Sequence, residues 1–156
     1  MSKFRILFVC LGNICRSPMA ETIMRAKVAE QGLSEVVKID SAGIISYHQG
    51  ESADARMRSF AFQRGYHIEG HSRPLVKEDY YNFDVIVGMD SSNVRDINNR
   101  RPDDAVAEIK LASQYLDSNE DVPDPYYGGA AGFTLVIDML EKICDAIIKK
   151  ELKNCS

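Results

Sequence analysis

The residues best suited to do chemistry lie together in the stretch VCLGNICRSPMAE, residues 9–21. It places a thiol, Cys10, at the end of an apolar run and a guanidinium, Arg16, six positions later. A cysteine thiolate is a strong nucleophile, and an arginine fork can bind two oxygens of a phosphate at once. The pattern therefore predicts nucleophilic attack by Cys10 on a bound oxyanion.

The other residues of this stretch favour a tightly curled loop that leads into a helix. Gly12 and Asn13 tolerate the left-handed backbone, and such curling turns successive N–H groups toward one point. Ser17 is a good N-cap and Pro18 a good first helical residue, so a helix N-terminus should add its positive charge there. The sequence predicts an anion cradle whose binding residues are Leu11, Gly12, Asn13, Ile14, Cys15 and Ser17, with the Ser17 hydroxyl donating to the Cys10 sulfur.

Short apolar runs alternate with helical patterns along the chain. The expected strands are residues 4–9, 36–40, 83–89 and 108–112, and the expected helices are 18–31, 53–65, 92–99 and 131–150. This alternation predicts an α/β fold, a parallel sheet with helices on both faces. Ligands bind such sheets at the carboxyl ends of the strands, which is where Cys10 lies. Cys144, on the apolar stripe of the last helix, is expected to be a packed core thiol.

The overall composition limits the kinds of function that are possible. The 156 residues, 45% hydrophobic, suit a single domain over 1–156, and no apolar run is long enough to span a membrane, so we expect a cytoplasmic protein. A net charge of −4 argues against a nucleic-acid or anionic-membrane surface. The four cysteines have no zinc-like spacing, so we expect reduced thiols, no metal and no cofactor.

Three motifs together resemble one known family. CLGNICRSPMAE at 10–21, DSAG at 40–43 and DPYYG at 124–128 are similar, in type and order, to the low-molecular-weight protein tyrosine phosphatases. The resemblance implies a flavodoxin-like four-stranded parallel sheet and metal-free hydrolysis of protein phosphotyrosine through a phosphocysteine on Cys10. It implies that Asp124 is the general acid and then the general base. The expected partner is a tyrosine-phosphorylated protein, and the expected state is a monomer with at most weak self-association.

The same resemblance assigns the residues around the loop. It places the aromatic side chains Tyr47, Tyr126 and Tyr127 at the mouth of the slot, and Ser41 and His71 as hydrogen-bond partners of the loop asparagine. By its own position, Asp90 ends the strand 83–89 and could pair with Arg16, cap the next helix, or do both. Since Asp124 must be protonated when substrate binds, we expect a mildly acidic optimum.

Two other functions remain open from the sequence, besides a redox role for Cys15. A Cys10–Cys15 disulfide could protect the nucleophile from over-oxidation. A thiol-dependent arsenate reductase on the same scaffold would need a further resolving cysteine in a segment near the loop, and residues 76–103 contain none. A non-catalytic phosphate-binding or redox-sensing module would need neither Cys10 nor Asp124, so their presence favours the enzyme.

Overall fold

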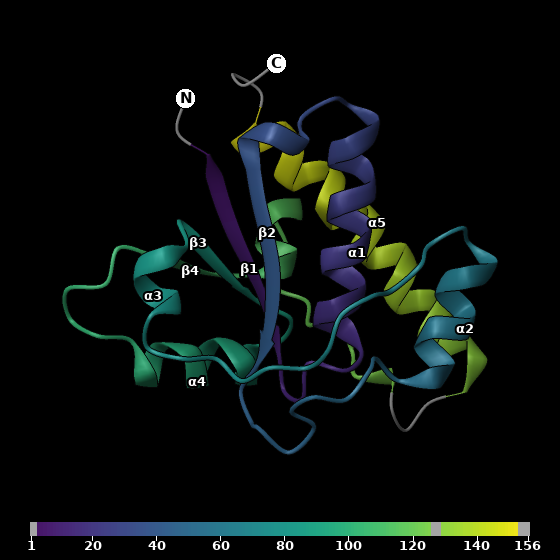
Figure 1. Cartoon of the computed structure of the whole chain (residues 1–156), viewed down its shortest axis with the longest axis horizontal. Helices are drawn as coiled ribbons and strands as arrows, with labels where there is room; N and C mark the ends of the chain where they lie inside the picture. The colour runs from purple at the N-terminus through teal and green to yellow at the C-terminus, as the bar shows by residue number, and fades with distance from the viewer. Residues whose placement is uncertain (1–2, 126–128, 153–156) are drawn as a thin grey trace.

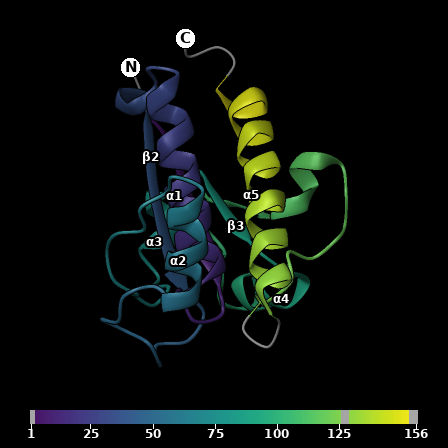
Figure 2. The ribbon, with the colours of Figure 1, turned by 90° about the vertical axis from the view of Figure 1, so that its right-hand side faces the viewer.

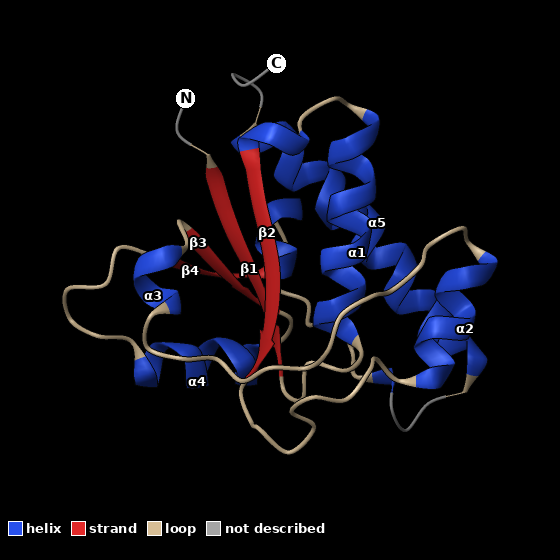
Figure 3. Ribbon diagram, in the orientation of Figure 1, coloured by secondary structure: helices blue, strands red, loops and turns tan. Residues whose placement is uncertain are grey.

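A computed structural model describes residues 3–125 and 129–152. Its sheet has four strands, β1 (Phe4–Cys10), β2 (Val37–Gly43), β3 (Val85–Gly88) and β4 (Glu108–Leu111). They lie in the order β2-β1-β3-β4 and all pair in parallel (Figure 3). The chain moves from β1 to β2 on one side and then to β3 on the other. The carboxyl ends of β1 and β3 therefore flank the switch point where such folds bind ligands.

Helices cover both faces of this sheet (Figures 1 and 2). On one face α1 (Arg16–Glu30) and α5 (Ala130–Glu151) pack side by side, with α2 (Ala55–Gln63) against α5. The short α3 (Asp79–Asn82) and α4 (Ser91–Arg100) cover the other face. Two 3-10 turns, η1 (Ser34–Val36) and η2 (Ala112–Leu116), complete the described elements. The predicted α/β architecture is confirmed.

The alternation of side chains along β1 explains why the strand must be central. Ile6 and Phe8 belong to the apolar cluster under α1 and α5, whereas Leu7 and Val9 belong to the cluster under α3 and α4. All four are fully buried. A strand that is apolar on both sides is stable only between two helical layers.

Most predicted boundaries agree with the structure within two or three residues, and two differences affect the site. β2 continues to Gly43, beyond the expected end at residue 40, because it stays paired with β1 up to Cys10. α1 begins at Arg16, two residues before the expected Pro18, with Cys15 at its N-cap position. Ser17 therefore lies in the first turn of the helix and does not cap it, which corrects the sequence prediction.

Cys144 has the place that the sequence predicts. It is fully buried on α5, where burial raises the pKa of its thiol, so it is a packing residue. Of the helices within 3–125 and 129–152, none combines the length and the apolar character needed to cross a membrane.

Candidate active site

The Cys10 loop, residues 10–17, joins the end of β1 to the start of α1. Asn13 has a φ of 56°, the left-handed conformation that the sequence predicts for it. Gly12 does not share this conformation, so that part of the prediction is wrong. Gly12 is needed for space instead, because a Cβ there would lie 2.9 Å from Cδ2 of His48. Asn13 therefore curls the loop, and Gly12 leaves space for the His48 ring to lie against it.

Two groups of Ser17, in the first turn of α1, face the Cys10 sulfur. The Ser17 hydroxyl lies 3.0 Å from Cys10 Sγ, and the Ser17 backbone N–H donates to the same atom at 3.5 Å. Backbone N–H groups in the first helical turn have no partner inside the helix, so they are available to an anion. Ser17 thus places its hydroxyl on the sulfur, as predicted, although it does so from inside the helix.

Arg16 is buried and held on one side. Its Nη1 donates to Asp90 Oδ2 at 2.7 Å and to the Val122 carbonyl at 2.9 Å, while Nη2 lies 3.9 Å from Asp124 Oδ2. Burial alone would lower the pKa of Arg16, but the Cys10 sulfur, Asp90 and Asp124 outweigh it and raise that pKa. The guanidinium therefore stays charged and fixed in orientation.

Asp90 takes both roles expected from its position. One carboxylate oxygen binds Arg16, and the other accepts the backbone N–H of Asn93 at 2.8 Å, which caps α4. A single side chain thereby fastens Arg16 to the start of the helix that follows β3.

A cavity of about 240 Å³ opens above the loop. Leu11 and Ile45 are partly exposed at its mouth, and Tyr47 is 82% exposed there with its ring edge-on to His48, 4.8 Å between centroids. His48 is held in turn by Glu51, whose Oε2 lies 2.7 Å from Nδ1. The full lining is Cys10, Leu11, Gly12, Ile14, Cys15, Arg16, Ile45, Tyr47, His48 and Asp124. Cys10, Arg16 and Asp124 thus share one small pocket with an apolar mouth.

The partners of Asn13 correct one expectation. Its Nδ2 donates to Ser41 Oγ at 3.0 Å, as predicted, but its Oδ1 accepts the backbone N–H of Arg73 at 3.0 Å. His71 is exposed and makes no hydrogen bond to Asn13 within the described residues. The segment around Arg73 runs beside the end of β2, where the N–H of Gly43 donates to the Arg73 carbonyl. This pairing directs the Arg73 N–H toward Asn13, and the His71 side chain stays exposed to solvent.

Cys15 lies in the same pocket as Cys10 and is buried. Burial, with the nearby Cys10, raises the pKa of its thiol, so Cys15 is protonated at neutral pH. A disulfide between the two cysteines stays a prediction. Two of the predicted wall residues, Tyr126 and Tyr127, lie outside the described residues.

Sequence reasoning missed three groups that shape this site: His48, Glu51 and the backbone N–H of Arg73. The tight approach of His48 to Gly12 is a contact between distant segments, and the residue types alone do not signal it. A backbone donor carries no side-chain signal at all. Among the residues described, no group of three His, Cys, Asp or Glu side chains is arranged to hold a metal ion.

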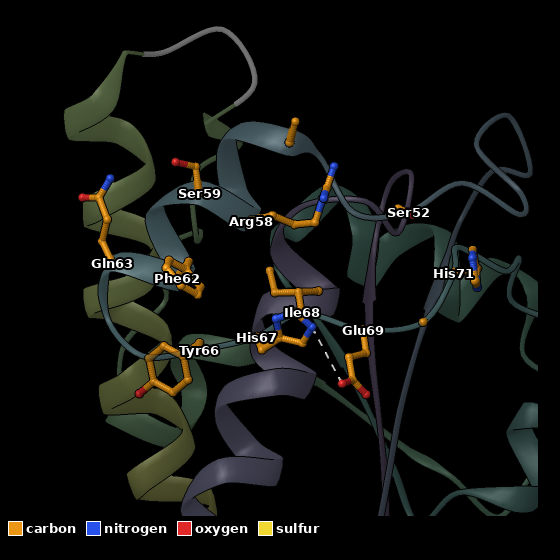
Figure 4. Close-up of a pocket in the computed structure, with 12 residues that line it drawn as sticks. Ser52, Arg58, Ser59, Phe62, Gln63, Tyr66, His67, Ile68, Glu69 and His71 are labelled. Atoms are coloured by element: carbon orange, nitrogen blue, oxygen red, sulfur yellow. Dashed lines mark ion pairs between the residues drawn. The ribbon is translucent and has the colours of Figure 1, made fainter.

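A larger cavity, about 710 Å³, lies beside α2 and shares no residue with the Cys10 pocket (Figure 4). The two ionisable side chains that lie close together in this cavity are His67 and Glu69. His67 Nε2 is 3.8 Å from Glu69 Oε1, and both side chains are at least 75% exposed. Figure 4 shows Phe62, Tyr66 and Arg58 around it. The described residues that line this cavity include no cysteine, so volume alone does not make it a second thiol site.

Comparison with known proteins decides the family. The family model described as low molecular weight phosphotyrosine protein phosphatase matches residues 5–155. The chain belongs to this family. A protein of that name from Schizosaccharomyces pombe is 43% identical over 134 residues, 84% of this chain and 86% of its own. The family resemblance seen in the sequence is confirmed, and with it the predicted enzyme class, a protein-tyrosine-phosphatase.

Solved structures show the same fold. A crystal structure of a protein tyrosine phosphatase from Entamoeba histolytica superposes with a TM-score of 0.92 at 42% identity, covering 99% of this chain and 100% of that one. A structure described as a Drosophila arginine phosphatase superposes with a TM-score of 0.87 at 30% identity, covering 93% and 96%. The four-stranded parallel architecture predicted for the family is thereby confirmed.

Proposed function

We propose that this chain, as one domain over 1–156, hydrolyses phosphotyrosine in proteins through a phosphocysteine on Cys10. The observation that carries the proposal is the convergence of three groups on one cavity of about 240 Å³. Cys10 lies at its floor with two Ser17 donors on the sulfur, Arg16 lies beside it, and Asp124 lines the same space. A nucleophile, an oxyanion binder and a proton donor are the parts that phosphoryl transfer requires.

In the first step the Cys10 thiolate attacks phosphorus, an S–P bond forms and the P–O bond to the tyrosine breaks. The Asp124 carboxyl gives its proton to the departing phenolate oxygen, which leaves as neutral tyrosine. Arg16 and the backbone N–H groups of the loop bind the non-reacting phosphoryl oxygens. Asp90 and the Val122 carbonyl hold the Arg16 guanidinium in the same orientation when substrate binds and when product leaves.

In the second step a water molecule attacks the phosphocysteine. The Asp124 carboxylate now accepts the proton of that water, an O–P bond forms and the S–P bond breaks. The products are inorganic phosphate and the Cys10 thiolate, which accepts the Ser17 hydroxyl hydrogen bond again. One carboxyl group thus serves both steps, which requires it to be protonated at the start and predicts a mildly acidic optimum.

The mouth of the pocket favours a long, flat substrate. Leu11, Ile45 and Tyr47 offer apolar surface around the opening, and an aromatic ring can lie against it. We expect a phosphoserine, which is shorter, to reach the thiol less well than a phosphotyrosine. The proposed substrate is therefore a tyrosine-phosphorylated protein, the proposed location is the cytoplasm, and the proposed state is a monomer with at most weak self-association.

The deciding experiment measures p-nitrophenyl phosphate hydrolysis from pH 4.5 to 8, with reductant and chelator, for wild type and Cys10→Ser. We expect turnover with an acidic optimum in the wild type and loss of roughly five orders of magnitude in the variant. Cys144→Ser, at a buried thiol outside the pocket, is the matched control for losing a thiol. Turnover that survives in Cys10→Ser would refute the phosphocysteine.

Substrate class is tested separately with a phosphotyrosine peptide and a phosphoarginine peptide of the same sequence, since one structural neighbour is described as an arginine phosphatase. We expect faster release of phosphate from the phosphotyrosine peptide. The reverse order would keep the thiol chemistry and replace the substrate.

A further inference from the structure

A chain of hydrogen bonds runs from the Cys10 sulfur to the Glu21 carboxylate on α1. Ser17 Oγ lies 3.0 Å from Cys10 Sγ. Asn13 Nδ2 donates to Ser17 Oγ at 2.8 Å and to Ser41 Oγ at 3.0 Å. Ser41 Oγ then donates to Glu21 Oε1 at 2.6 Å. The chain connects a reactive atom in the pocket to a carboxylate that the pocket does not contain.

The direction of the hydrogen bonds is fixed at two points of this chain, Asn13 and Glu21. A backbone N–H can only donate, so the Asn13 atom that faces the Arg73 N–H must be the carbonyl oxygen, and its NH₂ group must face the two serines. A carboxylate can only accept, and the other Glu21 oxygen, Oε2, accepts from Arg25 Nε at 3.0 Å and Nη2 at 2.8 Å. Arg73 therefore fixes the asparagine, and Glu21 fixes the proton of Ser41.

The direction of the chain decides which way the Ser17 proton points. A hydroxyl has one proton, and Ser41 uses its own on Glu21, so its oxygen accepts from Asn13. The Ser17 oxygen also accepts from Asn13, which leaves its proton for another acceptor. The Cys10 sulfur at 3.0 Å is closer than the Ala42 carbonyl at 3.5 Å. The serine thus presents a donor to the sulfur, which is the arrangement that favours a thiolate.

We propose that Glu21 is a positioning residue for the nucleophile. It holds Ser41 in the orientation that keeps the Asn13 side chain on Ser17, and so it secures both the curled loop and the hydroxyl donor to Cys10. The inference rests on the proposed thiol chemistry and adds a residue to it. A residue in this role acts through hydrogen bonds and never meets the substrate.

The surroundings of Glu21 contain other ionisable groups that the test must separate. Glu21 lines a polar cavity of about 160 Å³ behind the loop, together with Asp40, Glu69 and His71. Around Cys10 itself the charged or ionisable neighbours are Arg16, His48, Asp124 and Cys15. The variants below leave this second group unchanged.

The experiment compares wild type with Glu21→Gln, which keeps size and hydrogen-bonding capacity but can present a donor to Ser41. We expect a kcat about tenfold lower on p-nitrophenyl phosphate, in line with one weakened hydrogen bond to a charged group. Labelling of Cys10 by iodoacetamide, followed by peptide mass spectrometry, should reach its half-maximum about one pH unit higher. A merely structural role would lower the melting temperature without moving this labelling profile.

Two matched controls lie close by. Glu30→Gln removes an exposed carboxylate from the same helix, and His71→Ala removes the exposed imidazole beside the same cavity. Both should keep the wild-type kcat and labelling profile. A shift in His71→Ala as large as that in Glu21→Gln would make the effect a general electrostatic one and would overturn the proposal.

Ser41→Ala removes the hydrogen bond between Ser41 and Glu21 but keeps the carboxylate. It provides the same test if the Glu21→Gln variant does not fold. It should reproduce the shift, and adding Glu21→Gln to it should change the profile no further, because the two residues act in series. A folded Glu21→Gln or Ser41→Ala with the wild-type profile refutes the inference. Labelling needs no turnover, so a chain without thiol-dependent hydrolysis would refute the proposed function and still leave this link measurable.

Discussion

The Cys10 pocket and the larger cavity beside α2 differ in how firmly their lining side chains are held. The Cys10 pocket, about 240 Å³, is surrounded by buried polar groups that are each tied to others, such as Asn13, Arg16 and Ser17. The cavity beside α2, about 710 Å³, is lined by exposed side chains such as Phe62, His67 and Glu69. Side chains tied in a buried network are pre-organised for a charged ligand, and side chains in solvent are not.

The difference comes from where each cavity lies in the fold. The Cys10 pocket stands at the carboxyl ends of the central strands, where β1, β3 and two helices deliver side chains to one point. The cavity beside α2 lies between a short helix and the chain segment that follows it (Figure 4). The convergence of β1, β3 and two helices at the Cys10 pocket, and not the volume of a cavity, is the reason we propose this pocket as the active site.

Arg16→Lys should give the largest loss after Cys10→Ser, and it tests whether the buried network is specific to a planar fork. Lysine keeps the charge but cannot bind Asp90, Val122 and a phosphate together, so we expect roughly a thousandfold lower kcat/KM. Steady-state kinetics with p-nitrophenyl phosphate measure it. Arg58→Lys, at an arginine that lines the larger cavity, should stay near wild type. Similar losses of kcat/KM in Arg16→Lys and Arg58→Lys would mean that the Cys10 pocket and the larger cavity do not differ in their importance for turnover.

Asp124→Ala tests whether the Cys10 pocket contains a general acid in addition to the groups that bind phosphate. We expect a loss of roughly a hundredfold on phenyl phosphate, whose leaving group needs a proton. The loss on p-nitrophenyl phosphate, which expels a stable phenolate, should be much smaller. Equal losses on the two substrates would remove Asp124 from the acid role.

Gly12→Ala should sharpen the comparison by testing how tightly the pocket is packed. The added Cβ would meet Cδ2 of His48 at 2.9 Å, so the ring and its edge contact with Tyr47 must shift. We expect KM for aryl phosphates to rise about tenfold, since a small displacement near the reacting groups is costly. Gly132→Ala is the control, because its Cβ would lie at an ordinary 3.8 Å from Pro125. An unchanged KM would mean that His48 is not a wall of the site.

Phe62→Ser should give the smallest effect. The side chain is 73% exposed at the larger cavity, and surface substitutions of this kind change rates and stability little. We expect kcat/KM on p-nitrophenyl phosphate within about twofold of wild type. A loss comparable to that of Gly12→Ala would show that the larger cavity takes part in turnover.

The sequence predicted those parts of the molecule whose cause is local. The four strands follow from apolar runs, Cys10 and Asp90 follow from their positions at strand ends, and Arg16 follows from its place six residues after Cys10. Residue preferences predict a start of α1 at Pro18, two residues after its actual start at Arg16, because Ser17 is a common N-cap. In this structure the Ser17 hydroxyl contacts the Cys10 sulfur instead. That contact depends on how the loop curls, which residue preferences do not encode.

The rest of the site could not be predicted because it depends on contacts between distant segments. Asn13 needed an acceptor and a donor, and the structure supplies a serine from β2 and a backbone N–H from Arg73. Residue types cannot distinguish that N–H from any other. Glu21, four residues before Arg25, has the ordinary pattern of a surface ion pair on a helix, and only its contact with Ser41 sets it apart.

The position of β1 in the middle of the sheet has a consequence for how the enzyme should fail on heating. Both edges of this strand are paired, and the strand that carries Cys10 is among the best-protected parts of the fold. Amides in such a strand exchange with solvent only when the whole domain opens. Exposure of the strand that carries Cys10 and loss of native structure should therefore occur together in one cooperative transition.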